Sequence, residues 1–232
     1  MSTPRDLGIV YVTGGSSGLG AAVVDAVTQA GGKAAVIDRQ APADESVPFA
    51  QADLSDTAAA ERAVDELAEW FGPPEAVVTA AGTDACGPLT GVSVDDWERV
   101  VRVNLFGTAA VVRACLPHLE RTRGTVVTIG STLGLRPAGD ATAYCASKFG
   151  VVGFTRALAM ELAGRVGVTL VIPGGMRTHF FDGRTEQYRP PADAALNDPA
   201  DVAQCILTAL RQPVGCELRE LVVAASTEPS WP

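Results

Sequence analysis

The stretch Gly8-Ile9-Val10-Tyr11-Val12-Thr13-Gly14-Gly15-Ser16-Ser17-Gly18-Leu19-Gly20 decides the fold. Its first half is a short apolar run rich in β-branched residues, which predicts a buried strand. Glycines follow at positions 14, 18 and 20, and the apolar periodicity over residues 19–30 predicts a helix. A glycine loop between a strand and a helix offers backbone N–H groups to a pyrophosphate at the helix N-terminus. The stretch therefore predicts dinucleotide binding.

The rest of the chain repeats this alternation of strands and helices. Further strands are predicted over residues 33–38, 47–53, 75–80, 124–130, 166–172 and 219–225, and helices over 55–71, 141–163 and 198–210. Ser55 is the expected N-cap of the first of these helices. Ser93 or Asp95 should begin a helical region that runs, with breaks, to about Arg121. Apolar strands alternating with helices predict a parallel sheet covered on both faces.

Composition and charge narrow the class of protein. The chain has 232 residues, 47% of them hydrophobic and 19% charged, which predicts one globular domain over residues 1–232. A net charge of −9 without a cluster of Lys or Arg argues against partners such as nucleic acid or an anionic membrane. The longest apolar candidate for a membrane span, residues 149–163, is interrupted by Arg156 and Glu161.

Cysteine and histidine usage predicts neither disulfides nor a metal site. Five cysteines occur without a CxxC spacing, and the two histidines lie in no ligand pattern. Reduced thiols and an N-terminus without signal-peptide features predict a cytoplasmic location.

A second motif lies in the predicted helix over residues 141–163. Tyr144 and Lys148 are four residues apart, so they share one helix face, and Ser131 lies thirteen residues before the tyrosine. An unperturbed tyrosine has a pKa of about 10, too high for a base near neutrality. A neighbouring ammonium stabilises the phenolate, so we expect Lys148 to lower the pKa of Tyr144.

Together these motifs resemble the short-chain dehydrogenase/reductase family, of the type with TGxxxGxG and YxxxK, from about Gly8 to Ala225. The resemblance implies an α/β, Rossmann-like, doubly wound parallel sheet of about seven strands. It also implies a catalytic set, Asn104, Ser131, Tyr144 and Lys148. Tyr144 would exchange the proton, Lys148 would hold the nicotinamide ribose, and Ser131 would bind the substrate oxygen. Asn104 would break a helix and hold a water linked to Lys148.

The resemblance also implies a coenzyme-binding set. It comprises Gly14, Ser16, Ser17, Gly18, Leu19, Asp38, Arg39, Asp53, Leu54, Ala81, Gly82, Tyr144, Lys148, Pro173, Gly174, Gly175 and Thr178. Gly14 would permit the tight turn, Gly18 would clear the backbone for phosphate, and Gly20 would allow close helix–strand packing. Asp38 can accept both adenosine ribose hydroxyls and would repel a 2′-phosphate, which favours NAD, whereas Arg39 could bind that phosphate and keeps NADP as the alternative.

Two members of this set have competing interpretations, and one segment departs from the family pattern. Asp53 resembles the family aspartate that contacts the adenine amino group, but it could instead serve a helix-entry turn. Ala80-Ala81-Gly82 stands where the family usually has an asparagine, which leaves backbone packing against the coenzyme. The segment from Pro173 to Thr178 resembles PGxxxT, which would hold the nicotinamide carboxamide, although Thr178 could simply cap a turn.

The sequence is less informative about the substrate. Residues 84–89, 133–137 and the loop 178–197 should bound its pocket, and the aromatic residues of that loop predict an apolar one. Arg136 and Arg184 could meet an anionic group, but an exposed arginine is more often a solvated side chain.

We therefore expect an NAD-dependent oxidoreductase acting on a secondary alcohol or ketone. The alternatives are an NADPH-dependent ketone or 3-oxoacyl reductase and a non-catalytic dinucleotide-sensing protein. Apolar residues on more than one face of residues 95–121 and 141–163 predict a homodimer or homotetramer.

Overall fold

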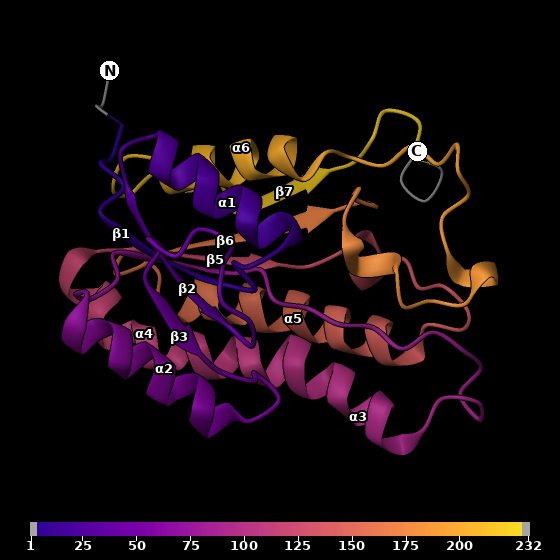
Figure 1. Ribbon diagram of the computed structural model, residues 1–232. Helices are drawn as coiled ribbons and strands as arrows, with labels where there is room; N and C mark the ends of the chain where they lie inside the picture. The colour runs from indigo at the N-terminus through magenta and orange to yellow at the C-terminus, as the bar shows by residue number, and fades with distance from the viewer. Residues whose placement is uncertain (1–3, 229–232) are drawn as a thin grey trace.

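The computed structural model describes residues 4–228, and within them seven strands form one sheet (Figure 1). The strands are β1 (Ile9–Thr13), β2 (Lys33–Asp38), β3 (Phe49–Gln51), β4 (Ala76–Thr79), β5 (Thr125–Ile129), β6 (Gly167–Pro173) and β7 (Glu220–Val223). Their order is β3-β2-β1-β4-β5-β6-β7, and every pairing is parallel. The predicted doubly wound α/β fold is confirmed.

Helices cover both faces of the sheet, as its buried strands require. On one face lie α1 (Gly18–Gln29) and α6 (Pro199–Leu210), and on the other lie α2 (Thr57–Trp70), α4 (Thr108–Thr122) and α5 (Thr142–Glu161). The helix α3 (Val94–Val101) packs beside α5. Each face has its own apolar core, built around Val12 and Ile206 on one side and around Tyr11 and Leu119 on the other.

The strand order places the site. From β1 the chain builds outward to β3 and then crosses back, so that β4 pairs with the other edge of β1. In an open parallel sheet, ligands bind beyond the carboxyl ends of the strands at this reversal. The loops that leave β1, β4, β5 and β6 meet there.

The helices α3 and α4 form one continuous helical segment, Val94–Thr122, whose α4 part lies on the same face of the sheet as α2 and α5. A π-helical segment, η1 (Arg102–Gly107), joins α3 to α4, so the predicted breaks are a change of helical pitch rather than interruptions. Within residues 4–228, Val94–Thr122 is the one helix long and apolar enough to cross a membrane, a segment that the sequence analysis did not single out. Half of its most apolar stretch is buried inside the fold, as expected of a core helix.

Two helix starts differ in how well the sequence predicted them. Ser93 caps α3, because its Oγ accepts the Asp96 N–H at 3.1 Å, so Asp95 is not the start. Ser55 was expected to cap α2, and that prediction is wrong. The cap is Asp56, whose Oδ1 accepts the N–H groups of residues 58 and 59 at 3.0 and 3.1 Å. The Ser55 hydroxyl donates instead to Asp53 Oδ1 at 2.8 Å, because the turn before α2 places the two side by side.

Candidate active site

In the glycine loop after β1, the backbone passes so close to neighbouring backbone atoms that two positions have no room for a side chain. Gly14 has φ +69°, and a Cβ there would lie 2.7 Å from Ala81 Cα. A Cβ at Gly20 would lie 2.1 Å from the Gly14 carbonyl oxygen, so α1 can pack this tightly on the loop only with glycine. Ser17 precedes α1 in extended conformation, and among the described residues its side chain caps none of the first N–H groups. Those donors are therefore available to an anion.

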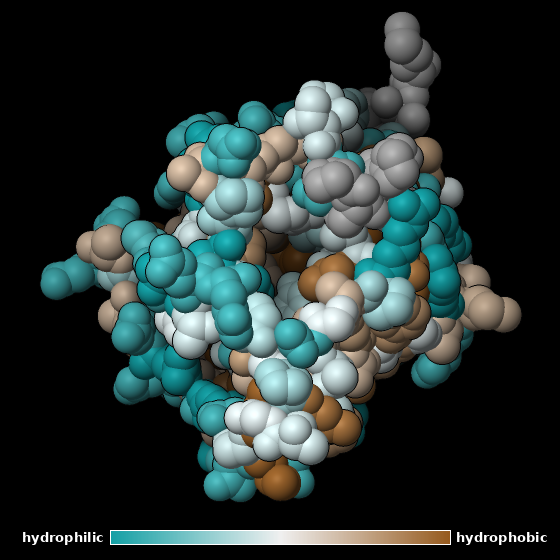
Figure 2. All heavy atoms as spheres, turned by 90° about the vertical axis from the view of Figure 1, so that its right-hand side faces the viewer, coloured by the Kyte–Doolittle hydropathy of each residue, from teal (hydrophilic) through white to brown (hydrophobic). Residues whose placement is uncertain are grey.

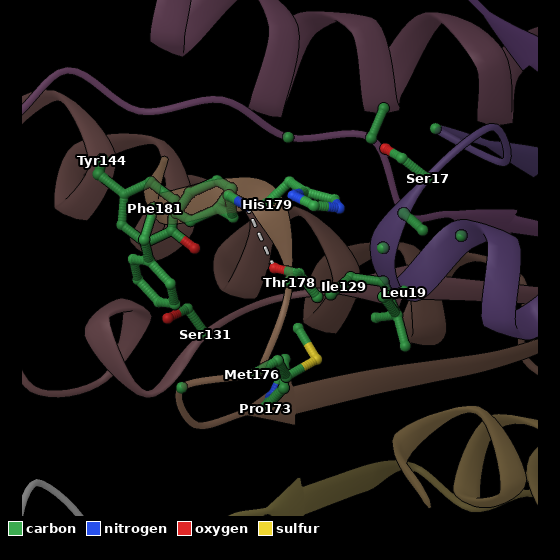
Figure 3. Close-up of a pocket in the computed structure, with 18 of the residues that line it drawn as sticks. Ser17, Leu19, Ile129, Ser131, Tyr144, Pro173, Met176, Thr178, His179 and Phe181 are labelled. Carbon is green, nitrogen blue, oxygen red and sulfur yellow. Dashed lines mark hydrogen bonds between the residues drawn. The ribbon is translucent and has the colours of Figure 1, made fainter. Parts of the chain in front are cut away.

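A cavity of about 830 Å³ runs from this loop across the carboxyl edge of the sheet. Figure 2 shows it as a central hollow with hydrophobic residues inside it and on its right side and hydrophilic residues on its left side. Its lining includes Gly14, Ser17, Gly18, Leu19, Asp38, Arg39, Asp53, Leu54, Ala81, Gly82, Ser131, Tyr144, Lys148, Pro173, Gly174, Gly175 and Thr178. Ser17 and Leu19 lie at one end and Ser131 and Tyr144 at the other (Figure 3). The fold thus brings most of both predicted sets to one cavity, whereas Ser16 and Asn104 are not among its lining residues.

Asp38, at the end of β2, is fixed at the cavity edge by backbone donors. Its Oδ2 accepts the Ser16 N–H at 3.1 Å, and its Oδ1 accepts the N–H groups of Arg39 and Gln40 at 2.6 and 3.3 Å. A carboxylate offers about four acceptor positions, so this arrangement leaves Oδ2 able to accept a further hydroxyl. The Arg39 side chain is exposed on the same edge.

Asp53 serves the turn that enters α2. Its Oδ1 accepts the Ser55 N–H at 2.9 Å, and its Oδ2 pairs with Arg99 Nη2, also at 2.9 Å. Burial alone would raise the pKa of Asp53, but hydrogen bonds from Ser55 and Arg99, with the charge of Arg99, lower it to about 2. The side chain thus makes the contacts of the helix-entry interpretation, while a contact with adenine stays a prediction. Arg99 also lines the cavity, which no sequence motif predicted.

Tyr144, Lys148 and Ser131 meet at the other end of the cavity. The first two project from α5, and Ser131 follows β5, where its Oγ accepts the Leu133 N–H at 3.1 Å. Lys148 is 5% exposed, its Nζ donates to the Ile129 carbonyl at 2.8 Å, and it lies 5.7 Å from the centroid of the Tyr144 ring. Burial lowers the pKa of Lys148 to about 8.

The acidity of Tyr144 differs from the expectation drawn from its spacing to Lys148. Burial raises the pKa of Tyr144 to about 12, and a hydrogen bond with Ser131 offsets part of that rise. The loss of solvation outweighs any help from Lys148, whose ammonium is itself desolvated and directed at the carbonyl of Ile129. In this structure Tyr144 is therefore a neutral phenol throughout the physiological range.

Asn104 lies in the π-helical segment η1 and holds two neighbouring elements together. Its Oδ1 accepts the Thr83 N–H at 2.8 Å, and its Nδ2 donates to the Thr83 carbonyl at 2.9 Å and to Ser147 Oγ at 3.0 Å. The residue is 1% exposed. It therefore ties the loop after β4 to α5 close to Lys148, and its predicted role in a water relay stays a prediction.

The segment after β6 carries the PGxxxT motif. The Gly175 N–H donates to Glu228 Oε2 at 3.4 Å, and the Gly175 carbonyl accepts the Asn197 N–H at 2.9 Å. Thr178 Oγ1 accepts the Phe180 N–H, so it caps the 3₁₀ turn η3 (His179–Phe181) while its side chain lines the cavity (Figure 3). Met176 and Glu228 also line the cavity. Sequence analysis missed both, because neither residue type carries a signal for this position.

The predicted substrate boundaries are met in part. Leu133 and much of the loop 178–197 line the cavity, whereas residues 84–89 and 134–137 do not. Asp84 contacts the loop through its ion pair with Arg184. Arg184, for which an anion contact and a solvated position were both considered, is 18% exposed and paired with Asp84, so it is not a solvated side chain. Across residues 4–228, no three His, Cys, Asp or Glu side chains are grouped to hold a metal ion. All five cysteines carry free thiols.

Comparison with known proteins agrees with this geometry. Residues 8–189 match the short chain dehydrogenase family. A glycine betaine reductase of Emericella nidulans is 34% identical over 95% of this chain, which spans 19% of that protein's length. A meso-2,3-butanediol dehydrogenase of Serratia marcescens is 31% identical, with 78% of this chain and 76% of the enzyme covered. The solved structure of an alcohol dehydrogenase from Thermococcus sibiricus, complexed with 5-hydroxy-NADP, is similar with a TM-score of 0.84 at 22% identity, covering 94% of this chain and 96% of that one.

The fold, the glycine loop and the tyrosine–lysine helix define a dinucleotide-binding oxidoreductase. The family match covers most of the chain, and the chain belongs to the short-chain dehydrogenase family. Membership places it among the NAD(P)-dependent oxidoreductases.

Proposed function

We propose that this chain transfers a hydride between NAD(H) and a secondary alcohol or the corresponding ketone, with Tyr144 as the proton donor and acceptor. The observation that carries the proposal is the joint position of Tyr144, Ser131 and Lys148 at one end of the cavity whose other end is the glycine loop. The butanediol dehydrogenase named above acts, by its name, on a secondary alcohol, which supports the same substrate class.

The residues present fit a dinucleotide. A Cβ at Gly14 or Gly20 would clash with the backbone of Ala81 or Gly14, so the tight loop requires glycine at both positions. The first N–H groups of α1, which the Ser17 side chain does not cap, would meet a pyrophosphate. Asp38 would hold the adenosine ribose, and Lys148 the nicotinamide ribose. When bound, the nicotinamide supplies the two-electron acceptor or donor for the reaction.

The side chains at the site then transfer the proton and stabilise the charges that develop. In the direction of reduction, the neutral Tyr144 hydroxyl donates its proton to the carbonyl oxygen of the ketone as that oxygen gains charge. The Ser131 hydroxyl, which lowers the pKa of Tyr144, would bind the same oxygen. Lys148 stabilises the resulting phenolate from the same helix face. The oxidation of an alcohol uses these groups in reverse, with the Tyr144 phenolate as the base.

Asp38 supports a preference for NAD(H) over NADP(H). A 2′-phosphate beside this carboxylate would bring like charges together in a partly desolvated cleft, which costs on the order of several kcal/mol. That cost corresponds to a discrimination of about a hundredfold or more. The exposed Arg39 guanidinium would offset part of it. Asp38→Ser should therefore narrow the preference.

Titration of both coenzymes, followed by a panel of alcohols and ketones in both directions, tests the proposal. We expect tighter binding of NADH than of NADPH and turnover of at least one secondary alcohol or ketone. Equal binding of NADPH would move the NADPH-dependent ketone or 3-oxoacyl reductase to first place. NADH binding without oxidation or reduction of any compound in a broad panel would favour a dinucleotide-sensing protein.

A cytoplasmic location completes the proposal, supported by the free thiols at all five cysteines.

A further inference from the structure

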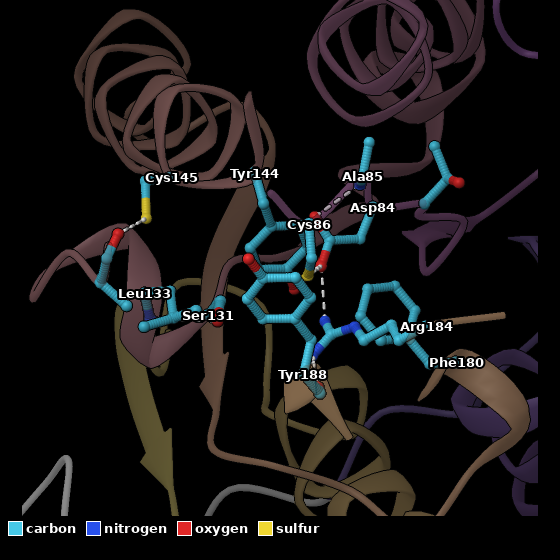
Figure 4. A network of polar contacts seen from close by, with 12 residues as sticks. Asp84, Ala85, Cys86, Ser131, Leu133, Tyr144, Cys145, Phe180, Arg184 and Tyr188 are labelled. Carbon is cyan, nitrogen blue, oxygen red and sulfur yellow. Dashed lines mark hydrogen bonds and ion pairs between the residues drawn. The ribbon is translucent and has the colours of Figure 1, made fainter. Parts of the chain in front are cut away.

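The wall of the cavity beside Tyr144 contains a guanidinium stacked on aromatic rings. The Phe180 ring centroid lies 5.7 Å from that of Tyr144. The guanidinium carbon of Arg184 lies 5.3 Å from the Phe180 centroid and 4.6 Å from the Phe181 centroid. Figure 4 shows Arg184 between Phe180 and Asp84, close to the tyrosine. A cation so close to the reacting centre would by itself attract an anionic substrate.

Asp84 neutralises that cation. Arg184 Nη2 and Asp84 Oδ2 are 2.5 Å apart, and the two side chains are only 18% and 5% exposed. Asp84 also accepts the Ala85 N–H at 2.7 Å and the Cys86 thiol at 3.0 Å, while Arg184 Nη1 donates to the Tyr188 carbonyl at 3.2 Å. Buried charges are costly unless they are paired and hydrogen-bonded, so each partner depends on the other.

We propose that the Asp84–Arg184 pair determines substrate specificity by making the site selective for neutral substrates and rejecting carboxylates. Both terminal nitrogens of Arg184 are engaged, Nη1 by the Tyr188 carbonyl and Nη2 by Asp84, and Nε, which has no partner among the described residues, is buried. An anion in the cavity would therefore be repelled by the nearby Asp84 carboxylate and would find no exposed guanidinium donor without disturbing the ion pair. Next to the pair the cavity is lined by the uncharged side chains of Met176, Phe180 and Phe181. The Lys148 ammonium beside Tyr144 donates to the Ile129 carbonyl. The inference rests on the proposed function and names the substrate class of the same site.

The pair also reaches Tyr144 electrostatically. The charge of Asp84 raises the pKa of Tyr144, and the charge of Arg184 lowers it, so the two oppose each other at the phenol. Removing the Asp84 charge alone should therefore have two effects. It should expose an uncompensated guanidinium to an anionic substrate, and it should move the pH profile of alcohol oxidation to lower pH.

Two ketones of nearly equal size and different net charge test the inference. They are 2,3-butanedione, which is neutral, and pyruvate, which is anionic. In the wild-type protein loaded with NADH, we expect kcat/KM to favour 2,3-butanedione by about a hundredfold. Asp84→Asn should reduce that ratio at least about tenfold, through a lower KM for pyruvate. The double variant Asp84→Asn with Arg184→Met, in which both charges are absent, is the matched control and should restore the preference for the neutral ketone.

Calorimetric titration of the NADH complex with each ketone separates this inference from the proposed function. Absence of turnover across the whole panel of alcohols and ketones counts against the proposed function, whereas the ratio of the affinities for these two ketones decides the specificity. A wild-type ratio near one, including no measurable binding of either ketone, overturns the inference, as does a preference for pyruvate. These wild-type outcomes hold even if a variant fails to fold. An unchanged ratio in an Asp84→Asn protein that still binds NADH overturns it as well.

Discussion

At the scale of single residues, the central feature is the protonation state of Tyr144. Sequence spacing predicted a phenol made more acidic by Lys148, whereas burial dominates in the structure and raises the pKa of Tyr144 to about 12. A neutral phenol at physiological pH is a proton donor, which suits the reduction of a ketone. Oxidation of an alcohol needs the phenolate, so pH should control the two directions differently.

We predict that kcat/KM for alcohol oxidation rises about tenfold per pH unit between pH 6 and 8, because the fraction of Tyr144 phenolate rises by that factor below its pKa. Lys148, whose pKa is about 8, keeps much of its charge over this range. Ketone reduction should change little over the same range, since the phenol stays protonated. Steady-state rates in both directions check this. A plateau in the oxidation profile below pH 8 would mean that Lys148 lowers the pKa of Tyr144 as the spacing suggested.

At the scale of helices, strands and loops, local sequence patterns predicted the elements, whereas contacts between residues far apart in the sequence could not be predicted. The alternation of apolar runs predicted every strand, although β3 pairs over only Phe49–Gln51 because the rest of its predicted length leaves the sheet. The predicted strand ends also put Ser131 and Asp38 at the carboxyl edge of the sheet, where both line the cavity. The Asp84–Arg184 pair joins residues 100 positions apart. No local periodicity encodes such a contact, because it arises from how the loop 178–197 folds back over the sheet.

The start of α2 offers a test at this scale. Asp56→Ala should lower the free energy of unfolding by about 1 kcal/mol, since two N–H groups of the first turn lose their acceptor. Asp56→Ser, which can still cap the helix, should lower it much less. Denaturant unfolding of both variants measures the difference. Equal stability of Asp56→Ala and the wild type would show that Asp56 does not act as the cap.

At the scale of the whole molecule, the outer surface of α5 and its neighbour η1 is unusually apolar. Phe106 on η1 is 52% exposed and Phe149 on α5 is 44% exposed, and the two elements pack against each other. Large apolar side chains exposed on adjacent elements are typical of a protein–protein interface. A symmetric pairing of this face with a second copy would cover both.

We therefore predict a homodimer or homotetramer in solution. Light scattering at micromolar concentration should give two or four times the mass of one chain, and Phe149→Glu should shift the protein toward the monomer by placing a charge in the interface. The variant should keep its secondary structure, since Phe149 contributes to the outer surface of α5 rather than to the core. A wild-type monomer under these conditions would rule out the assembly.

Comparison of the wild-type enzyme with Tyr144→Phe tests the central claim, that the Tyr144 hydroxyl exchanges the proton with the substrate beside a bound coenzyme. Removing the hydroxyl leaves the ring and its contact with Phe180 in place, so the coenzyme site should stay intact. We predict that turnover of the best substrate falls by about 10²–10⁴-fold, while the Kd for NADH, measured by fluorescence titration, is unchanged. Turnover within a few-fold of wild type would contradict the account.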